Sequence, residues 1–348
     1  MVSFLSPRPE PTCPGRPLPY TDGNQFTFDS AGAQRAGAPT AHTRTAQNGC
    51  RVARISTGVV PILIAALLWG TTGTAAHFLP DDVSPLATGA ATMAIGGGLL
   101  FLLSARGSIR AITDRSVRGW VVAGVAGIFV YPLAFYSSMN LAGVAIGTVI
   151  SLGSAPLFAA AIEYLVDRGR ISTRWALCTC IAVTGTVLLV LGSPIEPGSA
   201  QSDTPIGVLL GLLSGLSYAL YTDASRRVLA AGHGSNATMG ALFGLGALCL
   251  IPVLLFTGAP LVQSASSIGI TAYLALGPMF LAYILFGAGL RTVTSSTATT
   301  ITLVEPLVAT VLAIAIVGER LDPLGWLGLA LIMIGVVILV GWPVKKPR

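Results

Sequence analysis

Apolar residues in this chain collect into long, nearly uninterrupted stretches. A helix rises about 1.5 Å per residue, so about 20 apolar residues cross a hydrocarbon core that is about 30 Å thick. The stretches have about that length, and the pattern predicts ten membrane-spanning helices. Their predicted ranges are 58–79, 85–104, 119–138, 141–165, 174–192, 205–224, 236–257, 268–290, 293–317 and 323–342.

The composition agrees with the apolar pattern. Of the 348 residues, 53% are hydrophobic and only 10% are charged, whereas soluble domains carry about 25% charged residues. The predicted fold class is therefore an all-α integral membrane protein in a lipid bilayer. The net charge of +6 does not indicate a nucleic-acid partner, because the basic residues lie in short loops. The five cysteines show neither zinc-binding spacing nor a disulfide framework, and we expect no cofactor.

Residues 1–55 differ from the rest of the chain. They are rich in Pro, Gly, Ala, Ser and Thr, and their apolar residues show no periodic spacing. A segment of this composition buries too little apolar surface to fold, so we expect a disordered tail in the cytoplasm. No apolar segment typical of a signal peptide follows Met1.

Basic residues are confined to alternate connections between the spans. All but one of the 20 Lys and Arg residues lie in segments that ten spans place on one side of the membrane, and the exception is Arg320. Basic residues concentrate in the cytoplasmic loops of membrane proteins. The distribution therefore predicts that both termini are cytoplasmic, and we expect the protein in the plasma membrane.

The chain repeats itself at an offset of 150 residues. One constant offset over several spans predicts a duplication, with five helices in 58–192 and five in 205–342. Because five is odd, the two repeats enter the membrane from opposite sides, which is the inverted arrangement of many secondary transporters. The matched pairs include Ala87 with Ala237, Gly127 with Gly277, Pro156 with Pro306, and Gly185 with Gly335.

Two prolines, Pro156 and Pro306, occupy corresponding positions in the two repeats. Proline has no N–H group and crowds the carbonyl four residues before it, so the carbonyl of Thr302 should lose its helical partner. Interrupted helices at matching positions point to the binding site of such transporters. We expect both prolines to act as hinges at the interface of the repeats.

The predicted span 293–317 carries Glu305 as its only ionisable side chain, near its middle. A charged side chain there costs about 2.5–3.5 kcal/mol on insertion scales, so it usually faces protein or water. Helical spacing places Ser295, Thr302 and Glu305 on one small, polar face. We expect Glu305 to bind substrate or to couple transport to protons, since a proton and a cationic substrate would compete for it. A structural carboxyl that bonds to a neighbouring helix is the alternative.

Aromatic residues near the middle of other spans are candidates for the same site. An indole or a phenol gives a flat, partly polar wall that suits an organic solute. Trp69 and Tyr218 occupy comparable places in the first spans of the two repeats. Packing in the core or at the membrane interface is the alternative. The main candidates are Trp69 and Tyr218. Similar candidates with a weaker case are Tyr131, Tyr136 and Tyr283, and Thr302 lies on the same face as Glu305.

Other residues have simpler interpretations. Glu163 and Asp223 fall near cytoplasmic span ends, where a solvated or arginine-paired carboxylate is expected. The spaced glycines Gly207, Gly211 and Gly215 let helices approach closely. We expect them to serve packing within the chain. Rocking between the two repeats and contact between two copies in a homodimer are the alternatives.

Three stretches resemble the EamA domain of the drug/metabolite transporter superfamily. They are LLWGTTGTA from Leu67, LLSGLSYALYTDASRR from Leu212, and the long run from Pro306 to Val340. The resemblance covers about residues 58–342. The first repeat departs from the second, because Arg168-Gly169-Arg170 stands where the second has Gly318-Glu319-Arg320. The resemblance implies a ten-helix bundle that exports or exchanges small metabolites, often amino acids, amines or drugs.

The pattern and the resemblance together predict a secondary active transporter that works by alternating access, with a small-molecule substrate and protons as its partners. No GxxxxGK[ST] motif for ATP is present. An intramembrane enzyme that acts on lipid or peptide is one alternative, but the chain has no HExxH or GxSxG motif. A membrane sensor or scaffold that transports nothing is the other.

Overall fold

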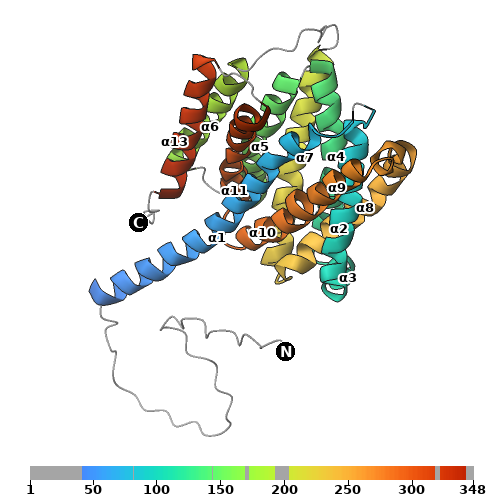
Figure 1. Cartoon of the computed structure of the whole chain (residues 1–348). Helices are drawn as coiled ribbons and strands as arrows, with labels where there is room; N and C mark the ends of the chain where they lie inside the picture. Colours follow the sequence, from blue (N-terminus) through green and yellow to red (C-terminus); the bar gives the residue numbers. More distant parts are fainter. Residues whose placement is uncertain are drawn as a thin grey trace, which may run out of the picture. The chain divides into compact units, whose positions relative to one another are not determined.

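The computed structural model of the protein describes residues 41–80, 82–142, 144–168, 172–192, 204–317 and 322–341. Contacts divide the chain into one unit of residues 1–54 and another of residues 55–348. In the first unit, the described residues 41–54 are helical. In the second unit, the described residues form helices joined by short connections and contain no strand (Figure 1).

Eight long helices and two segmented ones account for the predicted spans. The long helices are α1 (Ala41–Ala76), α2 (Pro85–Leu103), α4 (Arg118–Ala142), α5 (Val144–Asp167), α6 (Thr173–Leu191), α7 (Thr204–Ala230), α8 (Ser235–Thr257) and α13 (Pro323–Gly341). The first segmented helix comprises α9 (Ala265–Leu274), the π-helix η2 (Ala275–Leu281) and α10 (Ala282–Gly289). The second comprises α11 (Ser295–Ile301), α12 (Val304–Leu312) and the π-helix η3 (Ala313–Val317).

The membrane-spanning character of these helices follows from their length and composition. Among the described residues, nine helices are long and apolar enough to cross a membrane, and the apolar part of α6, Thr173–Leu189, is shorter. The prediction of an all-helical membrane protein is therefore confirmed. The count of ten crossings stays a prediction.

The structure differs from the sequence-based expectation in two places. Helix α1 begins at Ala41, well before the first predicted span at residue 58. No proline lies between Pro39 and Pro61, so nothing interrupts the helix before the first span. The short helix α3 (Ala105–Thr113) was not predicted, because its apolar face covers little more than two turns.

Small residues allow α7 to lie directly against α4 and α5. A Cβ atom on Gly207 would come within 2.6 Å of Ala142, and one on Gly215 would come within 2.7 Å of the Ser151 carbonyl. The Ser138 hydroxyl also donates to the Gly207 carbonyl at 2.7 Å. These glycines therefore serve packing within the chain, as expected.

Pairs of helices related by the 150-residue offset contact each other. Helix α2 packs on α8, and α6 packs on α13. At the second contact, a Cβ atom on Gly185 would lie 2.7 Å from the Gly328 carbonyl, so the two backbones touch. Helix α7 lies against both α4 and α5, and this arrangement joins the two sequence repeats over a broad area.

Candidate functional site

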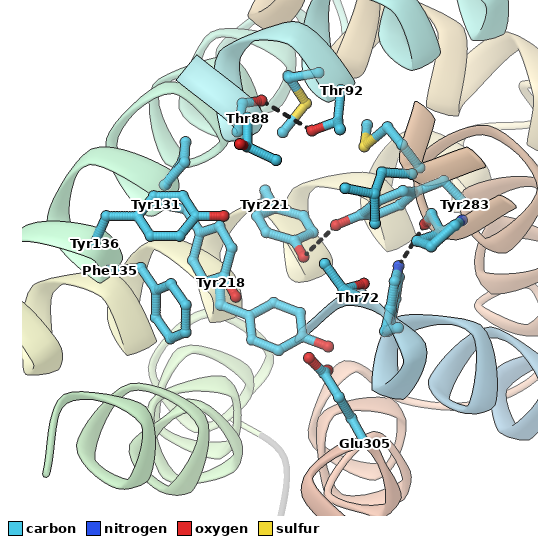
Figure 2. Close-up of a pocket in the computed structure, with 17 residues that line it drawn as sticks. Thr72, Thr88, Thr92, Tyr131, Phe135, Tyr136, Tyr218, Tyr221, Tyr283 and Glu305 are labelled. Carbon is cyan, nitrogen blue, oxygen red and sulfur yellow. Dashed lines mark hydrogen bonds between the residues drawn. The ribbon is translucent and has the colours of Figure 1, made fainter. Parts of the chain in front are cut away.

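A cavity of about 160 Å³ lies among helices of both repeats (Figure 2). Helices α1, α2 and α4 form one part of its wall, and α7, α9, η2, α10 and α12 form the other. The lining residues include six of the predicted site residues, which are Trp69, Tyr131, Tyr136, Tyr218, Tyr283 and Glu305. The structure therefore brings together side chains that are up to 236 positions apart in the sequence, from residue 69 to residue 305.

Trp69 is held in place by a carbonyl that an irregular helix leaves available. Its indole N–H donates to the Pro278 carbonyl at 2.8 Å. In the π-helix η2, the N–H of Ala282 bonds to the carbonyl of Gly277 and not to that of Pro278. The indole ring also lies 5.0 Å from the ring of Tyr283 and 5.2 Å from that of Phe286, between ring centroids. These contacts fix the indole as a rigid wall of the cavity.

Tyrosines form the opposite wall. Tyr218 and Tyr221 are three residues apart on α7, and their rings stack with centroids 5.2 Å apart. Tyr131 of α4 lies 5.6 Å from Tyr218. The hydroxyls of Tyr221 and Tyr283 are hydrogen-bonded at 3.2 Å. Several phenol groups therefore present both ring faces and hydroxyls to the cavity.

Glu305 follows directly after a break in its membrane span. Helix α11 ends at Ile301, and α12 begins at Val304. Pro306 cannot donate to the Thr302 carbonyl, and this carbonyl accepts instead from the N–H of Glu305 at 2.9 Å. The expectation that Thr302 loses its regular partner is met, and a tighter turn replaces the lost bond.

The Glu305 carboxylate has no partner among the described residues. It makes no hydrogen bond and no ion pair there, and Figure 2 shows it pointing from α12 into the cavity. Thr302, three residues before Glu305, accepts from the Tyr218 hydroxyl at 2.9 Å and donates to the Thr299 carbonyl at 2.9 Å. Thr302 thus braces Tyr218 and does not itself line the cavity.

Close packing of α1 against α12 places Trp69 and Glu305 in the same cavity. A Cβ atom on Gly70 would lie 2.6 Å from the Val308 side chain and 3.0 Å from the Glu305 carbonyl. Only glycine fits this contact without moving the helices apart.

Other predicted residues lie elsewhere. Pro306 is buried in α12 beside the cavity, and Pro156 lies within α5, which continues through it without a break. The two prolines are thus not equivalent, because only the helix of Pro306 is interrupted. Glu319 and Arg320 lie outside the described residues.

Sequence reasoning missed several residues of the cavity wall. Threonines and methionines in apolar spans look like ordinary packing residues, and their positions in the wall depend on helix rotation. A pattern of hydroxyls one turn apart on α2 was the available signal. The missed residues are Thr72, Thr88, Thr92, Met93, Phe135 and Met279.

Comparison with known proteins decides the family. The EamA-like transporter family matches the chain twice, over residues 56–191 and 205–341. The chain belongs to the EamA-like transporter family. Membership of the drug/metabolite transporter superfamily follows, and the EamA-like resemblance seen in the sequence is confirmed.

The relatives of this EamA-like chain carry transporter names. "Uncharacterized transporter YwfM" of Bacillus subtilis (strain 168) is 34% identical over 290 residues, which cover 82% of this chain and 94% of the relative. "Uncharacterized inner membrane transporter YicL" of Salmonella typhimurium strain LT2 is 25% identical, with 81% and 94% covered. A solved crystal structure with 20% identity and a TM-score of 0.68 covers 81% of this chain and 96% of its own, and it shares the fold.

Proposed function

We propose that this EamA-like protein is a secondary active transporter that exports a small organic cation across the plasma membrane in exchange for protons. The observation that carries the proposal is the carboxylate of Glu305, which has no partner among the residues that the structure describes and lies in a cavity with aromatic walls. Family membership supports transport itself. The substrate class, the direction and the coupling are inferred from the site.

The chemistry of the cavity favours a cation. Among the described residues, the lining includes no Lys, Arg or His, so Glu305 has no fixed counter-ion there. The ring faces of Trp69, Tyr131 and Tyr218 can attract a cation within about 6 Å of a ring centroid. An ammonium group or a proton can each neutralise the carboxylate, and the two therefore exclude one another. At about 160 Å³, the cavity is smaller than the roughly 300–1,000 Å³ of pockets for drug-sized ligands, which indicates a small solute.

The helix contacts support alternating access by two inverted repeats. The pairs α2 with α8 and α6 with α13 are each related by the 150-residue offset. Contacts between equivalent helices are what a two-fold relation between repeats of five helices would produce. In such transporters, one repeat rocks against the other around a site near the midplane, where Glu305 is expected.

Thiol labelling tests the proposed topology. We expect a cysteine at Ser266, exposed in the first turn of α9, to react with an impermeant reagent added to intact cells, and one at Ser116, exposed before α4, to stay unreactive until the cells are opened. The basic residues place the first position outside and the second in the cytoplasm. Both variants are made in a chain without its native cysteines. Labelling of the Ser116 position in intact cells would contradict the orientation and with it the cytoplasmic termini.

Transport in proteoliposomes tests the proposed function. We expect labelled small amines to accumulate in vesicles whose interior is more acidic than the outside, because protons leaving through Glu305 drive the exchange. Dissipating the pH gradient should stop accumulation, and empty liposomes serve as the control. Neutral and anionic analogues of the same size should not accumulate. Equal uptake of all three analogues, or uptake that ignores the gradient, would contradict the proposal.

A further inference from the structure

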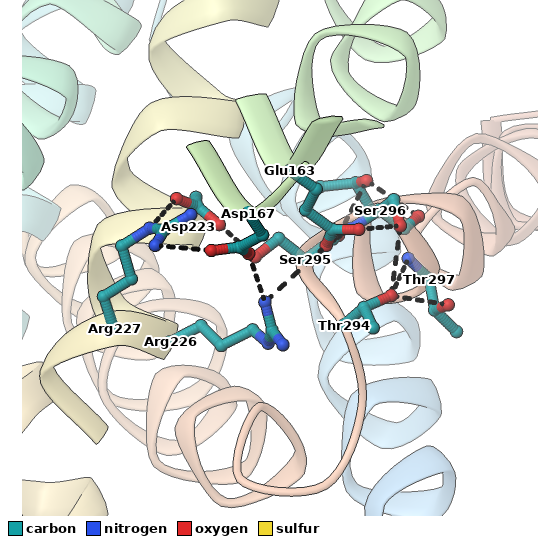
Figure 3. Close-up of polar contacts among 10 residues, drawn as sticks. Glu163, Asp167, Asp223, Arg226, Arg227, Thr294, Ser295, Ser296 and Thr297 are labelled. Carbon is teal, nitrogen blue, oxygen red and sulfur yellow. Dashed lines mark hydrogen bonds and ion pairs between the residues drawn. The ribbon is translucent and has the colours of Figure 1, made fainter. Parts of the chain in front are cut away.

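Three helix ends meet in a cluster of charged and hydroxyl side chains (Figure 3). They are the C-terminal ends of α5 and α7 and the N-terminal end of α11. Helix α5 belongs to the first family match, whereas α7 and α11 belong to the second. The distribution of basic residues predicts that these ends face the cytoplasm. None of the residues of this cluster lines the cavity.

Glu163 joins α5 to α11. Its two carboxylate oxygens accept from the N–H and from the hydroxyl of Ser296, each at 2.9 Å. Arg226 of α7 lies within 4.0 Å of Glu163 and 3.9 Å of Asp167. One acidic side chain of the first repeat therefore holds two helices of the second. Glu163 lies near an arginine, as the sequence analysis expected, and its hydrogen bonds to Ser296 are an additional finding.

Asp223 joins α7 to α11. It is fully buried and accepts from the Ser295 hydroxyl at 3.1 Å and from the Arg227 guanidinium. Arg227 also donates to Asp167 of α5 at 3.0 Å, and its guanidinium lies 4.4 Å from the centroid of the Trp120 ring of α4. A buried carboxylate that loses its partner is strongly unfavourable. This ion pair can therefore separate only if water reaches it.

Helix α7 carries residues of both the cavity and the cluster. Tyr221 lines the cavity two residues before Asp223, and it is hydrogen-bonded to Tyr283, which also lines the cavity. The break at Thr302 and Leu303 separates the part of the span near Ser296 from the part that carries Glu305. Along this span, the break in regular helix bonding thus stands between the residues of the cluster and Glu305.

We propose that Glu163, Asp167, Asp223, Arg226 and Arg227, with Ser295 and Ser296, form a cytoplasmic latch that closes the inner end of the transporter. The inference rests on the proposed transport function. With the latch closed, substrate exchanges with the outside only, and opening it lets substrate exchange with the cytoplasm. An ion-pair latch suits this position, because charges that separate at the water boundary regain hydration and can reform their pairs in the next cycle.

The latch is tested by the access of a thiol reagent from the cytoplasmic side. Thr299, 1% exposed, lies on α11 between Ser296 and the cavity, and a cysteine there reports opening. In inside-out vesicles we expect Glu163→Gln and Asp223→Asn to raise its labelling rate about tenfold, which corresponds to about 1.4 kcal/mol in the opening equilibrium. All native cysteines are replaced in these variants.

The matched control is Asp114→Asn. This change also converts an acid to its amide, and it removes a pair with His233 at 2.9 Å, outside the latch. Its labelling rate should equal that of the parent. If latch and control variants label at the same rate while all remain folded in detergent, the latch is overturned.

A second measurement does not depend on how the amide variants fold. Cysteines at positions 163 and 296, bridged by a short bis-thiosulfonate reagent, should stop transport, and a reductant should restore it. Transport that continues through the bridged protein would overturn the latch. The labelling test requires no transport, so faster labelling in a protein that moves no substrate would support the latch and contradict the proposed function.

Discussion

Glu305→Gln is expected to abolish the response of transport to a pH gradient while the amount of folded protein stays unchanged. The amide keeps the shape of the side chain and mimics the protonated acid, but it cannot release a proton. The carboxylate makes no hydrogen bond or ion pair with the other described residues. Replacing it therefore removes no contact that stabilises the fold. Transport of a cation should fall by about 100-fold or more, because removing one partner of a buried ion pair costs about 3–5 kcal/mol.

The measurement is uptake against pH for the parent and the variant at matched expression. Glu305→Asp is the control, because it keeps an acid in the cavity and should keep a pH-dependent profile with a changed rate. Exchange of a neutral substrate should survive in the Gln variant if such exchange occurs in the parent. An unchanged pH profile in the Gln variant, or a loss of folded protein, would show that Glu305 is a structural carboxyl.

Gly127→Val is expected to separate α4 from α7 and to disrupt the tyrosine wall. A Cβ atom at Gly127 would lie 2.7 Å from the Ser217 carbonyl and 3.2 Å from the backbone N of Tyr221. Both contacts are with backbone, so the helices must move apart. Overpacking of this kind costs about 1–3 kcal/mol, and we expect a loss near the upper end. Because Tyr221 moves with α7, the affinity for substrate should also fall.

Gly119→Val provides the matched control on the same helix. A Cβ atom there has open space around it, so the change should alter stability by less than about 0.5 kcal/mol. Thermal unfolding in detergent and the concentration dependence of uptake compare the two variants. Equal destabilisation by both would show that α4 requires glycine for reasons other than its contact with α7.

The spans and the central acid could be predicted from the sequence because each is a strong local signal. An apolar run of sufficient length has few alternatives to a membrane helix, and Glu305 is conspicuous in such a run. Trp69 and Tyr218 were found because they occupy comparable places in the two repeats. These signals need no knowledge of how the helices rotate.

The remaining features depend on interactions that the sequence does not display. The bond from Trp69 to Pro278 requires a π-helix, and the proline indicates an irregularity without specifying its form. Thr88 and Thr92 join the wall only because α2 turns that face inward. Glu163 looked like an ordinary carboxylate at a helix end, because its partner Ser296 is 133 residues away.

The single carboxyl in the cavity has an electrical consequence. The position in the first repeat that corresponds to Glu305 is Ala155, which is fully buried and carries no charge. With one acid at the site, the binding centre can be neutralised by one proton or by one monovalent cation. In the proposed transport, each exchange of the two moves no net charge, so we expect the membrane voltage to contribute nothing to the driving force. A doubly charged substrate would instead generate a current.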